Sequence, residues 1–178
     1  MSNLLQGLNI YLIGMMGSGK TTVGKHLARQ LQYRFIDTDR TIEAIAKQPI
    51  SAIFAESGEA SFRQLETQVL DSLSVYTRSV VATGGGIIQL PINWSYLRNG
   101  LVVWLDVDPE ILKQRVAQNQ NRPLAAKLES LLETRRPLYA QADLQISTKP
   151  EQSASEVAAM IIEQIPSVLK PQVESKNC

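Results

Sequence analysis

The sequence of 178 residues contains little cysteine, no long apolar run and almost no net charge. Its single cysteine is the last residue, Cys178, which excludes an internal disulfide and a metal site built from cysteines. No run approaches the roughly 18 apolar residues that a membrane-spanning helix needs. The net charge of +1, without a long basic run, argues against broad electrostatic binding of nucleic acid or of an anionic membrane.

What remains is the composition of an ordinary folded domain. Hydrophobic residues make up 44% of the chain and charged residues 20%, and the length suits one domain with a proper core. The first nine residues, MSNLLQGLN, contain no lysine or arginine and do not resemble a signal or transit peptide. We expect a single domain over residues 1–178 of a monomeric, cytoplasmic protein, and a processed organellar protein would show the same features.

Short apolar segments alternate with segments of helical period. The expected strands are NIYLI, RFID, SVVAT, LVVWL and LQIS. Expected helices include a short one over Ser51–Ser57, a long amphipathic one over Glu59–Tyr76 and a last one over Glu151–Ile165. This alternation predicts an α/β fold in which helices cover both faces of a parallel sheet. The polar stretch of residues 117–127 is typical of a lid, and residues 169–178 of a frayed tail.

A phosphate-binding loop follows the first expected strand. GMMGSGKT fits the pattern G-x-x-x-x-G-K-[ST] and stands between a strand and a helix. In such a loop the backbone N–H groups surround the phosphates, while Lys20 supplies charge to the β- and γ-phosphates and Thr21 offers its hydroxyl to Mg²⁺. The predicted ATP-binding residues of the loop are Gly14, Gly17, Ser18, Gly19, Lys20, Thr21 and Thr22.

Two acidic pairs are candidates for completing a Mg²⁺ site. FIDTD contains Asp37 and Asp39, and WLDVD contains Asp106 and Asp108. For the second pair we favour a structural role, because Asp108 followed by Pro109 is typical of a helix start. For Asp39, capping of the following helix and ligand binding are both open.

Two further segments are candidates for binding the molecule that accepts the phosphate. In FRQLE, Arg63 and Glu66 share one helix face, where they form either a surface ion pair or part of a binding site. In VVATGGGIIQL, a buried-type strand runs directly into Gly84, Gly85 and Gly86. Three consecutive glycines lose backbone entropy on folding, and a ligand lying against bare main chain would explain them.

Taken in order, GMMGSGKT, DTD, FRQLE, TGGG, NRPL and TRRPLY resemble the motifs of the shikimate kinase family, and the resemblance runs from about Asn9 to Ile165. It implies a three-layer α/β/α P-loop kinase fold of the nucleoside-monophosphate-kinase type, with a five-stranded parallel sheet and a mobile lid. It also implies transfer of a phosphoryl group from ATP to the 3-hydroxyl of shikimate, with Mg²⁺ as cofactor, in the chorismate pathway to aromatic amino acids. The partners would be shikimate and ATP, with no nucleic acid and no membrane.

The resemblance assigns the acceptor residues one by one. Arg63 and Arg135 would bind the carboxylate of shikimate, which suits a bidentate guanidinium. Asp39 would accept hydrogen bonds from the hydroxyl groups and help to take the proton. Glu66 would orient Arg63, and Gly84–Gly86 would offer main-chain N–H groups.

The same resemblance assigns the nucleotide end of the site. Asp37 would face the Mg²⁺ side together with Thr21. Arg122, within the lid, would join Lys20 in neutralising the transferred phosphoryl group. The residues expected around the adenine are Arg115, Lys149 and Pro150.

One departure from the family pattern concerns the lid, which looks several residues shorter because AAK leads straight into LESLLETRRPLY. Two other functions stay open. A related small-molecule kinase, such as one for gluconate, would not require Arg63, Glu66 and the triple glycine together. A catalytically silent binding or regulatory relative would be expected to lose Lys20, Asp39 or a substrate arginine, and none is lost.

Overall fold

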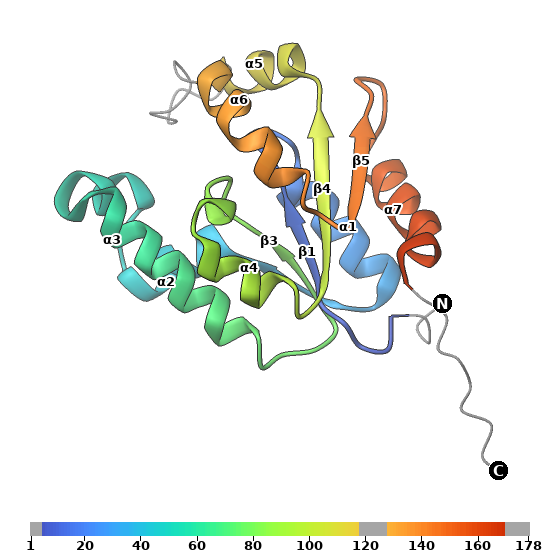
Figure 1. The fold of residues 1–178 in the computed structure, drawn as a ribbon, viewed down its shortest axis with the longest axis horizontal. Coiled ribbons are helices and arrows are strands. Elements are labelled where there is room, and N and C mark those ends of the chain that lie inside the picture. The colour runs from blue at the N-terminus through green and yellow to red at the C-terminus, as the bar shows by residue number, and fades with distance from the viewer. Residues whose placement is uncertain (1–4, 118–127, 170–178) are drawn as a thin grey trace.

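A parallel β-sheet lies at the centre of the computed structural model, which describes residues 5–117 and 128–169 (Figure 1). Its strands are β1 (Ile10–Ile13), β2 (Arg34–Asp37), β3 (Ser79–Ala82), β4 (Leu101–Val107) and β5 (Leu144–Thr148). All neighbouring strands are parallel, in the order β2-β3-β1-β4-β5. The prediction of five parallel strands is confirmed. The chain leaves β1 towards β2 on one side of the sheet and later crosses from β3 past β1 to β4 on the other side. The carboxyl end of β1 is therefore a switch point, where ligands commonly bind.

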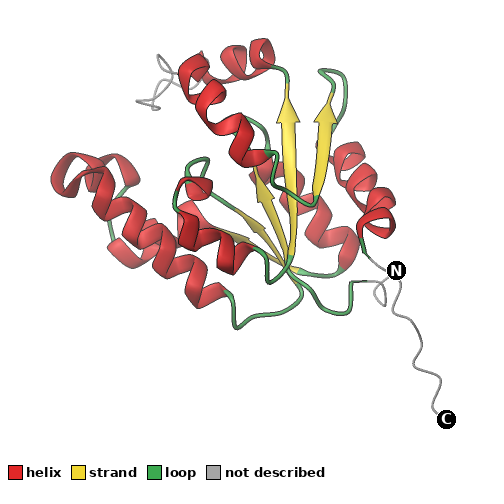
Figure 2. Ribbon diagram, in the orientation of Figure 1, coloured by secondary structure: helices red, strands yellow, loops and turns green. Residues whose placement is uncertain are grey.

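Helices cover both faces of the sheet (Figure 2). They are α1 (Lys20–Leu31), α2 (Thr38–Ala46), α3 (Ile50–Leu73), α4 (Pro91–Leu97), α5 (Pro109–Ala117), α6 (Leu128–Tyr139) and α7 (Ala154–Val168), with a 3₁₀ turn η1 (Ile87–Gln89). Side chains of β1 alternate between the two faces, as a strand requires. Ile10 and Leu12 pack in the core under α1 and α7, whereas Tyr11 and Ile13 pack in the core under α2, α3, α4, α5 and α6.

Helix α3 contains the break that the sequence predicts between two helices. Gly58 has φ 78° and ψ 171°, a conformation that an L-amino acid rarely adopts, and the helix bends there. The predicted end at Tyr76 is wrong, because Ser74 bonds through both its amide and its hydroxyl to the carbonyl of Asp71 and the helix ends at Leu73. Tyr76 therefore lies beyond the helix and is 45% exposed instead of completing the apolar stripe.

Three other boundaries depend on local capping. Helix α7 begins at Ala154, later than predicted, because Ser153 and Glu156 form a reciprocal capping box. Helix α5 begins where predicted, and the Asp108 carboxylate accepts from the amide of Glu110 at 2.8 Å. We did not predict η1 and α4, although Pro91 at the first turn of α4 is a usual start signal.

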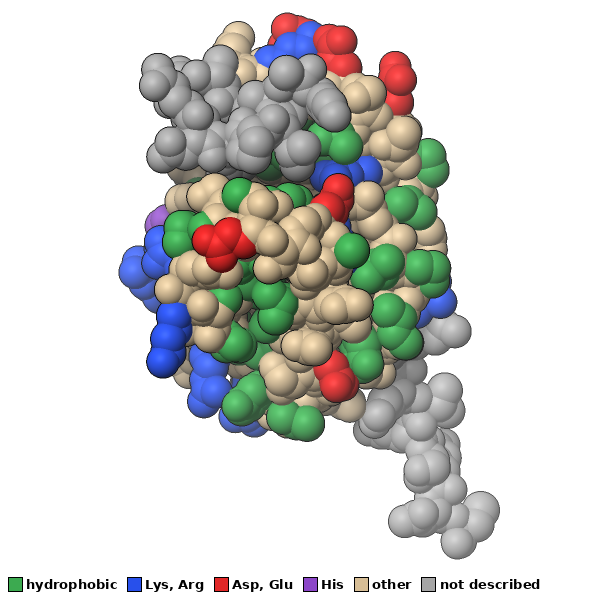
Figure 3. Space-filling model, turned by 90° about the vertical axis from the view of Figure 1, so that its left-hand side faces the viewer, with side chains coloured by type: hydrophobic (Ala, Val, Ile, Leu, Met, Phe, Trp, Pro, Cys, Tyr) green, Lys and Arg blue, Asp and Glu red, His purple; other side chains and the backbone are tan. Residues whose placement is uncertain are grey.

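The face of the molecule in Figure 3 is neither mainly hydrophobic nor mainly charged. Hydrophobic side chains alternate with polar ones there, and Lys and Arg gather along one edge. Within residues 5–117 and 128–169, no helix combines the length and apolar character needed to cross a bilayer. The predicted lid with Arg122 and the predicted tail lie outside the described residues, apart from Ala117 and Leu169 at their edges.

Candidate active site

A pocket of about 1170 Å³ opens at the carboxyl ends of the strands, between the loop after β1, the kinked helix α3 and the start of α7. It brings the nucleotide and acceptor candidates into one cavity. The predicted residues that line it are Gly17, Ser18, Gly19, Lys20, Thr21, Thr22, Asp37, Asp39, Arg63, Glu66, Gly84, Gly85, Gly86, Arg115, Arg135 and Lys149. Gly14 and Pro150 are described but do not line it, and Arg122 lies outside the described residues.

The loop between β1 and α1 forms the phosphate end of the pocket. Helix α1 begins after Gly19, with no side-chain hydrogen bond at that cap, so the N–H groups of its first turn face the pocket. Such a helix start favours anions. The Lys20 ammonium group is buried and donates to the carbonyl groups of Gly14 and Met15 at 2.7 and 2.8 Å. The loop therefore holds its own lysine in place.

Thr21 and Asp37, the two predicted Mg²⁺ ligands, lie side by side. The Thr21 hydroxyl donates to Oδ2 of Asp37 at 2.8 Å. Oδ1 of Asp37 accepts from the amides of Asp39 and Arg40, which makes Asp37 the cap of α2. The alternative that Asp39 caps this helix is wrong, because Asp39 already stands in the first turn of α2.

The donor set at Thr21 and Asp37 fits a magnesium ion. Within the part of the chain that the structure describes, no group of three or more His, Cys, Asp or Glu side chains forms a metal site. Magnesium in phosphate-transfer enzymes usually takes one or two protein oxygens together with water and substrate phosphates. One carboxylate and one hydroxyl beside the phosphate end are therefore sufficient protein ligands.

The second acidic pair has the structural role that we favoured. Asp108 caps α5, as described above. Asp106 accepts from Arg136 at 3.0 Å and from Gln145 at 2.8 Å, and neither aspartate lines the pocket.

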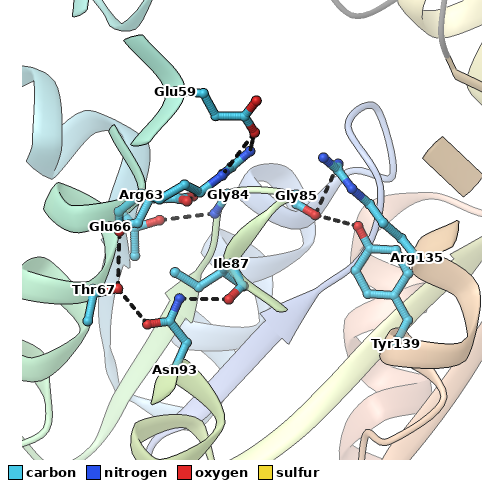
Figure 4. A network of polar contacts seen from close by, with 11 residues as sticks. Glu59, Arg63, Glu66, Thr67, Gly84, Gly85, Ile87, Asn93, Arg135 and Tyr139 are labelled. Carbon is cyan, nitrogen blue, oxygen red and sulfur yellow. Dashed lines mark hydrogen bonds and ion pairs between the residues drawn. The ribbon is translucent and has the colours of Figure 1, made fainter. Parts of the chain in front are cut away.

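Arg63 and Glu66 form a buried charge cluster on α3 and not a surface ion pair (Figure 4). Nη1 of Arg63 lies 2.5 Å from Glu66, whose side chain is 0% exposed. Nε and Nη2 of Arg63 donate to Glu59 at 3.3 and 2.9 Å. Burial raises the pKa of Glu66 to about 7, although the charge of Arg63 opposes the shift. Burial alone would lower the pKa of Arg63, and the two glutamates raise it above its ordinary value.

The triple glycine is explained first by the protein's own side chains. A Cβ on Gly84 would lie 2.5 Å from a Glu66 oxygen and 2.9 Å from a carboxylate oxygen of Asp39. A Cβ on Gly86 would overlap the guanidinium group of Arg63. Two of the three glycines therefore leave room for side chains of the predicted acceptor site to lie against the main chain. Contact of a ligand with this segment stays a prediction.

Arg135 reaches the same segment from α6, on the opposite side (Figure 4). Its side chain is 4% exposed, and its Nη1 lies 3.4 Å from the carbonyl oxygen of Gly85. The Tyr139 hydroxyl donates to the same carbonyl at 2.5 Å, while the Tyr139 ring stacks on Trp104 at 5.9 Å between centroids. Burial raises the pKa of Tyr139 to about 12, so this hydroxyl keeps its proton.

The far end of the pocket is lined by Arg115 and Lys149, two of the three residues predicted around an adenine, whereas Pro150 does not line it. Nη1 of Arg115 donates to the carbonyl of Gly17 at 3.2 Å, which ties α5 to the phosphate loop. Lys149 and Gln152 line the pocket after β5, and the Gln152 side chain accepts from the Lys149 amide at 2.7 Å.

Three contributors to the site were missed by sequence reasoning. Thr38 accepts from the amide of Gly84 at 3.1 Å and is fully buried. Glu59 stands four residues before Arg63, a spacing that favours a helical ion pair and so was a usable signal. Tyr139 ends the segment TRRPLY, but its contact with Gly85 depends on the packing of α6 against η1.

Comparisons with known proteins agree with this geometry. Residues 16–166 match a family model described as shikimate kinase. The chain is 55% identical over 176 residues to a shikimate kinase of Trichormus variabilis, covering 96% of this chain and 97% of the relative. It is also 52% identical over 178 residues to one of Synechococcus elongatus, covering 96% and 93%.

Solved structures give the same result for the fold. A shikimate kinase from Acinetobacter baumannii in complex with shikimate superposes with a TM-score of 0.88 at 40% identity, covering 94% of this chain and 98% of that one. One from Aquifex aeolicus superposes with a TM-score of 0.80 at 34% identity, covering 90% and 97%. The predicted P-loop kinase fold of the nucleoside-monophosphate-kinase type is thereby confirmed.

Proposed function

The chain belongs to the shikimate kinase family, and from this premise we propose what each part of its pocket does. As a member of the family it is a kinase that phosphorylates shikimate. We propose the 3-hydroxyl group as the acceptor, with shikimate 3-phosphate and ADP as products. The observation that carries the proposal is one cavity in which the predicted phosphate loop faces buried Arg135, largely buried Arg63 and an aspartate.

ATP would bind with its phosphates at the start of α1. The amides of Gly17, Ser18 and Gly19 and of the first turn would donate to phosphate oxygens. Lys20 would exchange its two carbonyl acceptors for the β- and γ-phosphates, since a charged acceptor forms the stronger hydrogen bond. Thr22 also lines this end of the pocket. Gly14 does not line it, but its carbonyl group accepts a hydrogen bond from Lys20.

Thr21 and Asp37 would hold the magnesium ion, either directly or through water. When bound, the ion neutralises charge on the phosphates. Asp37 is already fixed for this task, because its second oxygen caps α2. Arg115 would lie on one side of the adenine, with Lys149 and Pro150 on the other.

Shikimate would bind between α3 and α6. Arg63 and Arg135 would form charge-assisted hydrogen bonds with its carboxylate. Glu66 would hold Arg63 in place from behind, and the backbone N–H groups of Gly85 and Gly86 would contribute polar contacts. The N–H group of Gly84, which we also expected to contribute, already donates to Thr38. Arg63 already has two carboxylate partners, whereas buried Arg135 has none among the described residues. An anionic substrate would offset the cost of burying the Arg135 charge.

Asp39 would align the accepting hydroxyl group. It is half-buried in the first turn of α2, close to Gly84 and facing the pocket. Its carboxylate would accept a hydrogen bond from the hydroxyl group and help to take its proton. Phosphoryl transfer depends mainly on alignment and charge neutralisation, which Asp39, Lys20 and, from the lid, Arg122 would supply.

The alternative functions lack comparable support. A gluconokinase from Sinorhizobium meliloti superposes with a TM-score of 0.59 at 18% identity, which shows a shared fold alone. A silent relative is disfavoured because Lys20, Asp39, Arg63 and Arg135 are all present and converge on one pocket. We propose a monomeric, cytoplasmic enzyme with ATP and shikimate as partners and with no nucleic acid or membrane.

A coupled ADP-release assay tests this function. With Mg-ATP, ADP release should depend on shikimate, and gluconate or nucleoside monophosphates should not replace it. Folded protein that releases no ADP with shikimate would overturn the proposal. Analysis of the product by NMR should show the phosphate on the 3-oxygen.

A further inference from the structure

Gln89 ends the turn η1 and reaches both arginines of the acceptor end. We assign its amide with the oxygen facing them, because only this orientation gives both the oxygen and the nitrogen suitable partners. The oxygen then accepts from Nη2 of Arg63 at 3.2 Å and from Nη2 of Arg135 at 3.0 Å. One neutral oxygen thus bridges two cationic side chains that come from α3 and α6. Neither the sequence motifs nor the pocket lining pointed to this residue.

The backbone of Gln89 is firmly held. Its amide donates to the carbonyl of Gly86 at 3.0 Å. The carbonyl groups of the two preceding residues accept from the side chains of Asn93 and Trp94 in α4, at 2.7 and 3.1 Å. Asn93 also accepts from Thr67 of α3 at 2.8 Å, which connects the turn to the helix that carries Arg63 (Figure 4). A side chain on such a support can fix the position of its partners.

The two bridged arginines differ in charge balance. Arg63 has the carboxylates of Glu59 and Glu66 as partners. Among residues 5–117 and 128–169, no carboxylate lies within ion-pair distance of Arg135, and its Nε has no hydrogen-bond partner. Gln89 therefore supplies Arg135 with an acceptor without neutralising it. A carboxylate at the same place would compete with an anionic substrate.

We propose that Gln89 positions Arg63 and Arg135 at a fixed spacing and makes the acceptor end selective for a carboxylate. This inference rests on the proposed function, in which these arginines bind the carboxylate of shikimate. Gln89 acts through the arginines and is a positioning residue. Because its side chain is exposed, it can be replaced without opening the core.

The experiment compares an anionic ligand with a neutral one. Calorimetry on nucleotide-free protein would measure Kd for shikimate and for its carboxamide, in the parent protein and in Gln89→Glu and Gln89→Met. The methionine keeps the length of glutamine but removes the acceptor. Gln68→Glu is the matched charge control, since Gln68 is exposed on α3 and does not line the pocket.

Gln89→Glu should weaken shikimate binding at least tenfold, while binding of the carboxamide changes less than threefold. Gln89→Met should weaken shikimate binding about fivefold and raise the KM for shikimate, with kcat changed less than twofold. Gln68→Glu should leave both Kd values within twofold of the parent values.

Different failures have different meanings. A parent protein that binds acid and carboxamide equally would overturn carboxylate recognition by the arginines, and with it the proposed binding mode. A parent that prefers the acid, together with a Gln89→Glu variant that keeps the same preference, would overturn the role of Gln89 alone. A Gln89→Met variant with unchanged affinity and KM would show that the bridge positions nothing.

Discussion

The two ends of the pocket are built in different ways. The phosphate end comes from one continuous segment, and Lys20 bonds to carbonyl groups only six and five residues before it. The acceptor end gathers side chains from α2, α3 and α6 around the glycines after β3, with contacts between residues 50 and 54 positions apart. The first depends on local backbone geometry, and the second depends on tertiary packing.

Because of this difference, substitutions at the two ends should affect ligand binding and folding stability differently. At the phosphate end, most of the proposed donors are backbone N–H groups at a helix start, and these persist when a side chain changes. At the acceptor end, charged side chains are buried against one another, so a change there alters both ligand binding and folding stability. Variants at the two ends should therefore differ in which quantity they change, and each prediction below tests that separation.

The largest effect is expected at Lys20. Lys20→Ala should lower kcat at least a thousandfold, about 4 kcal/mol in barrier height, because the transferred phosphoryl group would lose one of the cations proposed to neutralise it. Shikimate affinity of the nucleotide-free protein should stay within threefold, and circular dichroism should be unchanged. A variant that keeps a tenth of the parent turnover would remove Lys20 from the chemistry.

Arg63→Lys should act on both binding and stability. A single ammonium group cannot contact Glu59 and Glu66 and also bind a carboxylate with two parallel hydrogen bonds. We expect the Kd for shikimate to rise at least 30-fold, about 2 kcal/mol. The free energy of unfolding should fall by about 1–3 kcal/mol, because buried Glu66 loses its geometry.

The control for Arg63→Lys is ATP affinity, which should change less than twofold because Arg63 lies at the other end of the pocket. Calorimetry and urea unfolding provide the measurements. Unchanged shikimate affinity, even with lower stability, would leave Arg63 a structural residue.

Much of the phosphate end could be predicted because its signals are local. Five apolar segments identified the five strands, and the spacing from Gly14 to Thr21 identified the loop. The expected break between the helices over Ser51–Ser57 and Glu59–Tyr76 coincides with Gly58, whose positive φ is a conformation that glycine adopts readily. Such features depend on residues within a turn or two of one another.

The acceptor end could be predicted only in part. The sequence placed Arg63 and Glu66 on one helix face, but it left open whether that face is exposed, and only the packing of α3 buries it. That Asp37, and not Asp39, caps α2 depends on where β2 ends. The contact of Gln89 with both arginines joins elements whose spatial order no local pattern contains.

The pH dependence of stability tests the burial of Glu66. The pKa of Glu66 is about 7 in the folded protein against 4.5 for an exposed glutamate, so the folded state binds a proton that the unfolded state releases. This contribution to stability is fully present below pH 4.5 and is lost as the pH rises through 7. The difference of roughly 2.5 units corresponds to about 3 kcal/mol.

Glu66→Gln removes the titrating group and nearly keeps its shape. Urea unfolding of the parent and of the variant at pH 5 and pH 8 isolates the contribution, since the other titrating groups are shared. The parent should lose about 2–3 kcal/mol more stability than the variant between these pH values, because part of the contribution is already lost at pH 5. If the free energy of unfolding changed with pH equally in both proteins, the pKa of the Glu66 carboxyl group would not be raised by burial.

The smallest effect is expected when Arg136 is replaced. Its neighbour Arg135, in contrast, should be one of the most sensitive positions. Arg135 is almost fully buried beside Gly85, and Arg135→Ala should raise the KM for shikimate at least tenfold. Arg136 is 50% exposed, pairs with Asp106 and lies over the ring of Trp104 at 5.5 Å. Half-exposed ion pairs contribute little, so Arg136→Ala should lower the free energy of unfolding by no more than about 1 kcal/mol. Its KM for shikimate should stay within twofold, because the helical turn of α6 directs only the first of the two arginines into the pocket. Steady-state kinetics on both variants would measure the KM for shikimate. If the two substitutions raised the KM equally, α6 would have to be rotated about its axis so that both arginines reach the pocket.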